Sequence, residues 1–189
     1  MRICQYLFMS CLFMGAFGGA KAQAEMGVAN FRQIPAALSG LTGITSKQTE
    51  IRSYYLSNLS KFPQLGQLSE VTTPFFLAQL SYSSLYCARF VSREKLRLPQ
   101  ERWALSSVDF GQAINQLEDP ARLRALVSDL AIQFWGRGLT SEELSILEEE
   151  AKTWVSDPDP IDGRSVLEST LVNLCSTLLS TPAVWGSTP

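Results

Sequence analysis

Apolar residues recur every three or four positions over most of this chain, between residues that typically begin and end helices. The clearest example opens at Asp119 and Pro120, an acidic cap followed by proline, and closes at Gly136. Between these ends, the apolar positions 123, 126, 127, 130 and 134 lie on one helical face. No stretch combines the alternating pattern of a strand with the turn residues of a hairpin. The pattern therefore predicts an all-α protein.

Six or seven helices are expected, packed as one compact multi-helix bundle, because neither a repeat nor a domain-sized linker divides the chain. Thr73 is expected to cap the third helix, with proline at the first helical position. Thr45 and Gln48 have the spacing of a capping box, as do Thr140 and Glu143. The expected helices cover residues 30–43, 45–59, 73–91, 106–117, 119–136, 140–154 and 162–178.

The four cysteines fall into two groups. Cys4 and Cys11 lie in an apolar leader, whereas Cys87 and Cys175 lie on the apolar faces of two expected helices. In an oxidising compartment, an even pair of this kind forms a disulfide. Closing a loop of about 90 residues would stabilise the fold by about 4 to 5 kcal/mol. Two buried free thiols are the alternative, because unbonded cysteine is often buried as well.

Residues 1–24 have the pattern of a cleavable secretion signal. Arg2 precedes the uncharged run 3–19, and Ala22-Gln23-Ala24 matches a cleavage site before Glu25. The alternatives are cleavage after Ala22, lipoprotein cleavage before Cys11, and an uncleaved membrane anchor. The anchor is disfavoured because the apolar run is shorter than the about 20 residues that a membrane span needs. We expect residues 25–189 to form a single helical domain with a short irregular C-terminal tail and no stable membrane span. Its expected location is the periplasm or the outside of the cell.

The charge balance and the absence of histidine exclude several functions. Arg2 and Lys21 leave with the leader, so 14 basic residues remain against 18 acidic ones. The basic residues near 93–102 alternate with Glu94 and Glu101, which disfavours nucleic-acid binding. The chain has no histidine, which excludes Ser-His-Asp and Cys-His catalysis and argues against a catalytic zinc site. We expect no cofactor.

Acidic residues near the C-terminus suggest two candidate sites. Asp157, Asp159 and Asp162, followed by Glu168, approach the spacing of a calcium loop, but the acidic positions are one place out of frame. A stiff turn between helices, with Asp162 as the cap, is the alternative. Glu168-Ser169 is similar to the Glu-Ser pair of lytic transglycosylases, in which the glutamate is a general acid. The later motifs of that family are absent, and a solvated helix residue is the alternative reading of Glu168.

Two further features of the sequence are candidate sites. Ser92 and Lys95 match the Ser-x-x-Lys pattern of penicillin-binding serine enzymes, but the partner motifs are missing. A solvated helix end is the alternative. Trp103 and Trp185 lie outside the regular helical patterns and are candidate exposed contact residues.

Residues 134–144, Phe-Trp-Gly-Arg-Gly-Leu-Thr-Ser-Glu-Glu-Leu, and 174–182, Leu-Cys-Ser-Thr-Leu-Leu-Ser-Thr-Pro, carry a resemblance. This part of the chain resembles helical domains of unknown function in exported bacterial proteins, including those that accompany secreted c-type cytochromes. The resemblance implies an exported helical domain and supplies no catalytic residues. We therefore expect a non-catalytic interaction or assembly module of the bacterial cell envelope with a protein partner. The alternative is a cell-wall hydrolase using Glu168.

Overall fold

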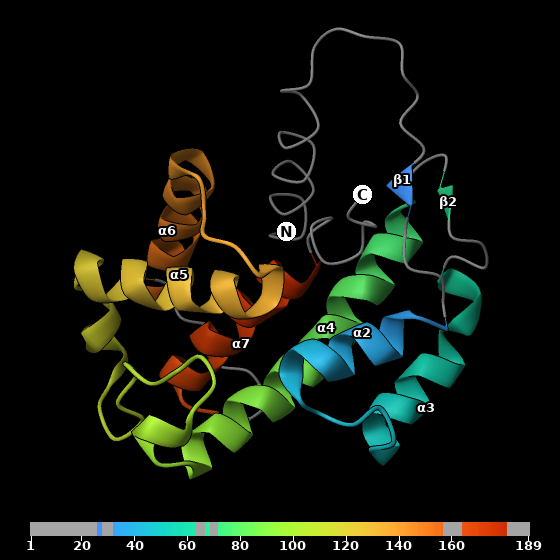
Figure 1. The fold of residues 1–189 in the computed structure, drawn as a ribbon, viewed down its shortest axis with the longest axis horizontal. Coiled ribbons are helices and arrows are strands. Elements are labelled where there is room, and N and C mark those ends of the chain that lie inside the picture. The colour runs from blue at the N-terminus through green and yellow to red at the C-terminus, as the bar shows by residue number, and fades with distance from the viewer. Residues whose placement is uncertain (1–25, 28–31, 63–66, 69–71, 157–163, 181–189) are drawn as a thin grey trace, which may run out of the picture.

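The computed structural model describes residues 26–27, 32–62, 67–68, 72–156 and 164–180. Within these residues the chain forms six α-helices, three short 3-10 helices and one pair of two-residue strands (Figure 1). The prediction of an all-α bundle is confirmed. The α-helices are α2 (Ile34–Thr42), α3 (Thr49–Ser57), α4 (Thr73–Leu96), α5 (Pro120–Trp135), α6 (Ser141–Ser156) and α7 (Val166–Ser180). The other elements are η1 (Leu59–Lys61), η2 (Pro99–Glu101), η3 (Ile114–Leu117) and the antiparallel strands β1 (Met26–Gly27) and β2 (Gln67–Leu68).

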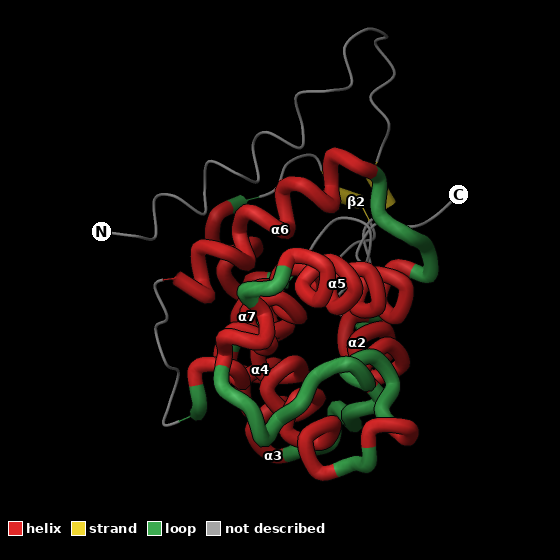
Figure 2. Tube along the Cα trace, turned by 90° about the vertical axis from the view of Figure 1, so that its left-hand side faces the viewer, coloured by secondary structure: helices red, strands yellow, loops and turns green. Residues whose placement is uncertain are grey.

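The long helix α4 runs through the middle of the molecule, with α2 and α3 on one side and α5 and α6 on the other (Figure 1). Its most extensive contact is with α7, while α5 and α6 contact each other as well as α7. Seen from the side, the helices follow one another from α6 through α5 and α7 to α4 and α3 (Figure 2). The core therefore centres on the contact between α4 and α7.

Cys87 of α4 and Cys175 of α7 meet at this central contact. Their Sγ atoms lie 2.08 Å apart and their Cα atoms 5.7 Å apart, and both residues are fully buried. This is the geometry of a disulfide, as the sequence predicts. The bond would join two helices whose cysteines are 88 positions apart.

Aromatic side chains of α4 hold α3 and α5 against it. Tyr82, Tyr86 and Phe90 are fully buried. The ring of Tyr82 lies 5.9 Å from that of Tyr54 in α3, and the ring of Phe90 lies 5.7 Å from that of Phe134 in α5. Each such pair adds to the stabilisation that comes from burying the rings.

Helix α4 is longer than the sequence predicts. Thr72, rather than Thr73, caps it, because the Thr72 hydroxyl accepts a hydrogen bond from the backbone N–H of Phe75. The helix continues to Leu96, beyond the expected end at position 91. The added turn carries Glu94, which is buried and continues the inward face of the helix.

Other predicted boundaries are also wrong. Helices α2, α3 and α7 each begin four residues later than expected. For α3 the reason is local: the Thr45 hydroxyl accepts from the N–H of Lys47 and so stabilises a turn instead of a helix start. The expected helix over 106–117 shrinks to η3, because the Gln116 side chain bonds both the backbone N–H and the carbonyl of Asp109. The expected starts at Asn30 and Asp162 lie outside the described residues.

The capping box of α6 is confirmed. The Thr140 hydroxyl accepts from the N–H of Glu143 at 3.2 Å, and the Glu143 carboxylate accepts from the N–H of Thr140 at 2.9 Å. Hydrogen bonds from the Arg137 guanidinium, more than any other contact, lower the pKa of Glu143 to about 2. Among the described residues, no helix is both long enough and apolar enough to cross a membrane.

Candidate functional site

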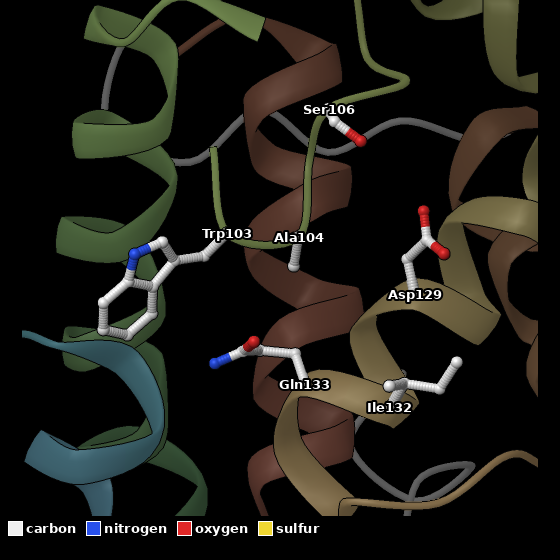
Figure 3. A pocket seen from close by; sticks show the side chains of 6 residues that line it. All are labelled: Trp103, Ala104, Ser106, Asp129, Ile132 and Gln133. Carbon is white, nitrogen blue, oxygen red and sulfur yellow. The ribbon is translucent and has the colours of Figure 1, made fainter. Parts of the chain in front are cut away.

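A shallow, open pocket lies between α5 and the segment 97–119 that connects α4 to α5 (Figure 3). Its volume is about 220 Å³. Pockets for small-molecule ligands typically span about 300–1,000 Å³, so this one suits a single side chain or a group of similar size. The lining residues are Trp103, Ala104, Ser106, Asp129, Ile132 and Gln133.

Glu94 fixes the backbone at one edge of this pocket. Its side chain is fully buried, and its carboxylate accepts from the N–H groups of Trp103 at 2.6 Å and Ala104 at 3.4 Å. The guanidinium groups of Arg93 and Arg97 lie 3.4 Å and 3.6 Å from the same carboxylate. A buried carboxylate is tolerated only when it is paired and hydrogen-bonded, and this one satisfies both conditions. Glu94 therefore holds the connecting segment against the end of α4.

Arg102, which belongs to the same connecting segment, stabilises it by binding its backbone. Its guanidinium donates hydrogen bonds to the carbonyl of Leu105 at 3.2 Å and to that of Val108 at 2.6 Å. It also stacks over the ring of Phe110, 4.8 Å from the ring centre. Leu105 is fully buried, so the segment is anchored by both polar and apolar contacts. The pocket edge is consequently a fixed structure despite being built from a long connection.

Trp103 is partly exposed, with 47% of its surface accessible. The guanidinium of Arg93 stacks over its ring at 4.8 Å. Figure 3 shows the ring pointing away from Asp129, toward α2 and α4. There it passes so close to Gly43 that a Cβ atom on Gly43 would lie 2.7 Å from Cη2 of the ring. Gly43 therefore makes room for the tryptophan that the sequence predicts as an exposed contact residue.

We expect Gly43→Ala to lower the free energy of unfolding by about 3 kcal/mol. The φ angle of Gly43 is +64°, which costs a residue with a side chain about 1–2 kcal/mol, and overlap with the Arg93 guanidinium and the Trp103 ring adds to this. Gly136→Ala is the matched control, because its φ is +66° and nothing lies within 4 Å of the added Cβ. Urea unfolding of the two variants measures the difference. Equal losses would mean that neither Arg93 nor Trp103 packs against Gly43.

Helix α5 supplies the polar wall of the pocket. The Gln133 side-chain nitrogen donates to the carbonyl of Leu41 at 3.0 Å, which leaves the amide oxygen available as an acceptor. The Asp129 carboxylate makes no hydrogen bond or ion pair with any described residue, and burial raises the pKa of this carboxyl. In Figure 3 this carboxylate and the Ser106 hydroxyl face the same space. The polar groups of the pocket are thus mainly acceptors.

No family model, no curated protein and no solved structure matches this chain.

The structure brings together two residues that the sequence placed in separate candidate sites. Glu168, in the first turn of α7, forms an ion pair with Lys95 of α4. The Ser92 hydroxyl donates to the carbonyl of Ala88 at 2.8 Å, within its own helix. None of these residues lines the pocket.

The remaining predicted site residues lie outside the described part of the chain. These are the calcium candidates Asp157, Asp159 and Asp162, and the predicted contact residue Trp185. Within the described residues, no three His, Cys, Asp or Glu side chains are grouped so that they could hold a metal ion.

Three residues of the site were not singled out from the sequence: Glu94, Arg102 and Asp129. Glu94 did carry a signal, because it follows Cys87 by seven positions and Val91 by three, which places it on the same helical face. Arg102 carried none, since it follows the polar residues Gln100 and Glu101 and its role depends on tertiary contacts. Asp129 lies in the mainly apolar stretch 126–132, but no local pattern shows which segment packs beside it.

Proposed function

We propose that this protein is an exported, non-catalytic helical interaction module of a bacterial cell envelope. The observation that carries the proposal is the pair of buried cysteines, Cys87 and Cys175, at bonding distance in the core. Disulfides form and persist mainly in oxidising compartments outside the cytoplasm. The leader pattern in residues 1–24, ending in Ala22-Gln23-Ala24, would direct the chain there. The resemblance of residues 134–144 to domains of exported proteins agrees with this location.

The exposed apolar side chains support binding. Six large apolar side chains are exposed in the described residues, and two of them, Trp103 and Ile132, line the pocket. Exposed apolar side chains around a pocket are typical of interaction surfaces, and tryptophan is common at the centre of such surfaces. Two more, Leu96 and Leu98, lie at the end of α4 and at the start of the connecting segment.

The chemistry of the pocket also favours binding over catalysis. Among the lining residues, only the Ser106 hydroxyl and the Asp129 carboxylate could act as nucleophiles, and neither a histidine nor a lysine lies among them to activate Ser106. The alternative of a cell-wall hydrolase would need Glu168 in a cleft that holds the sugar chain. Glu168 is instead paired with Lys95 and lies outside the pocket, so we do not propose that activity.

A photo-crosslinking amino acid at position 132 should join the protein to a partner in intact cells. Ile132 is 56% exposed at the pocket rim, where a partner would cover it. The crosslinked chain should be recovered from outside the cytoplasmic membrane, with an N-terminus near Glu25 and with thiols that react only after reduction. Fractionation, N-terminal sequencing and thiol alkylation measure these properties.

Position 56 provides the matched control, because Leu56 is 57% exposed but lies on α3, which does not line the pocket. A crosslink at 132 and none at 56 is the expected result. Equal crosslinking at both positions, or none at either, would contradict the interaction surface. A cytosolic chain that keeps Met1 and two free thiols would contradict export.

A further inference from the structure

We propose that the pocket between α5 and the connecting segment receives the cationic end of a lysine or arginine side chain from a protein partner, with Asp129 as the counter-ion. This inference rests on the proposed interaction function and names the chemistry that the partner must present. Its support comes from the donor and acceptor groups of the pocket, from the unpaired carboxylate and from the apolar rim.

The pocket offers oxygen acceptors to whatever enters it. Both carboxylate oxygens of Asp129 are free of described partners, and the Gln133 amide oxygen is left over because the amide nitrogen is bound to Leu41. The Ser106 hydroxyl can accept as well as donate. An ammonium or guanidinium group has donors and no acceptors, so it is the natural complement of such a set.

Asp129 and Glu150 are the two partly buried acids that have no partner among the described residues, and of these two only Asp129 lines the pocket. Glu143, Glu148 and Glu168 are each paired with an arginine or a lysine. Asp129 also caps no helix, since it lies in the third turn of α5, where aspartate is an unfavourable residue. Burial without a partner raises the pKa of Asp129 and opposes its charge. A cation from outside the chain would supply the missing charge.

The rest of the pocket suits the apolar stem of a long basic side chain. Ala104 and Ile132 place methyl groups beside the acceptor oxygens. Lysine and arginine bury their methylene stems against such surfaces while the charged end reaches polar groups. The volume of about 220 Å³ admits one such side chain rather than a larger ligand. An excess of acidic over basic residues in the chain would also steer a basic partner toward it.

The test is a titration of the isotope-labelled protein, followed by the backbone amide signals of residues 106, 129 and 133. The probes are an acetylated and amidated pentapeptide, Ala-Ala-Lys-Ala-Ala, and the same peptide with norleucine, which keeps the methylenes and removes the charge. We expect saturable shifts with the lysine peptide and at least fivefold weaker binding of the norleucine peptide. Asp129→Asn should weaken binding of the lysine peptide about fivefold to tenfold. Glu118→Gln, which removes one exposed and unpaired charge from the same connection, should leave it unchanged.

Equal binding of the two peptides, no saturable shift with either, or unchanged binding by Asp129→Asn would overturn the inference. Tighter binding of putrescine than of the lysine peptide would overturn the assignment to a protein side chain. If Asp129→Asn loses its helical circular dichroism, the inference is tested by comparing the affinities of the two peptides for the unsubstituted protein. The titration needs no native partner. If the titration fails but position 132 crosslinks to a partner, only the proposed binding of a cationic side chain is contradicted. If the titration succeeds but no crosslink forms, only the proposed interaction function is contradicted.

Discussion

Replacing Cys87 and Cys175 together by alanine is expected to lower the free energy of unfolding by about 4 kcal/mol. The bond closes a loop of 88 positions, and the chain-entropy model gives about 4 to 5 kcal/mol for a loop of that length. Much of the effect arises in the unfolded state, which gains freedom when the link is removed. Urea unfolding of both proteins measures the loss, and the slope m should be larger for the variant because its unfolded chain exposes more surface.

The unsubstituted protein after reduction provides the control. Because both cysteines are fully buried, a reductant should reach the sulfurs only when the contact between α4 and α7 opens. Reduction should therefore be slow in buffer and fast near the urea midpoint. The reduced protein should then unfold at about the same urea concentration as the alanine variant. Equal stability of the oxidised and reduced proteins would show that the two thiols are not bonded in the native fold.

Glu94→Ala is expected to lower the free energy of unfolding by about 3 kcal/mol. The substitution leaves the N–H groups of Trp103 and Ala104 without their acceptor, and it removes the charge between Arg93 and Arg97. Removing one partner of a buried ion pair typically costs about 3–5 kcal/mol, and the partial exposure of the two arginines favours the lower value. Urea unfolding measures the loss, and the amide signals of residues 103 and 104 should shift as the pocket edge is released.

Glu101→Ala is the matched control, because Glu101 is an exposed glutamate in the same segment and its carboxylate has no described partner. A change within about 0.5 kcal/mol is expected there. Glu94→Gln should fall between the two, since the amide oxygen can still accept from the N–H of Trp103 while the charge is lost. A loss for Glu94→Ala no larger than that for Glu101→Ala would show that Glu94 does not hold the connecting segment.

Local sequence signals predicted the fold class, one helix cap and the pairing of the cysteines. Each helix needs an apolar face, and the spacing of that face survives in any tertiary setting, so the all-α class could be predicted. The capping box at Thr140 and Glu143 could be predicted for the same reason, because both partners lie within one turn. The cysteine pairing followed from there being only two cysteines beyond the leader. Export itself stays a prediction.

The predicted helix boundaries are wrong where a side chain can make more than one local contact. The spacing of Thr45 and Gln48 equals that of a capping box, yet the Thr45 hydroxyl stabilises a turn and α3 starts four residues later. The expected end of α4 at position 91 is wrong because the charged residues that follow it have the composition of a solvated segment. Glu94 is buried there, and its partners Trp103 and Ala104 lie in a connection whose path no local pattern specifies. The pocket could not be predicted for the same reason, since its two walls come from separate parts of the chain.

The link between α4 and α7 also determines how the molecule would respond to being pulled. Every residue that lines the pocket lies between positions 103 and 133, inside the covalent ring that Cys87 and Cys175 close. Tension applied through the two ends of the polypeptide would pass across the sulfur bridge and bypass that ring. The pocket would therefore bear no mechanical load, even while the segments outside the ring were being stretched.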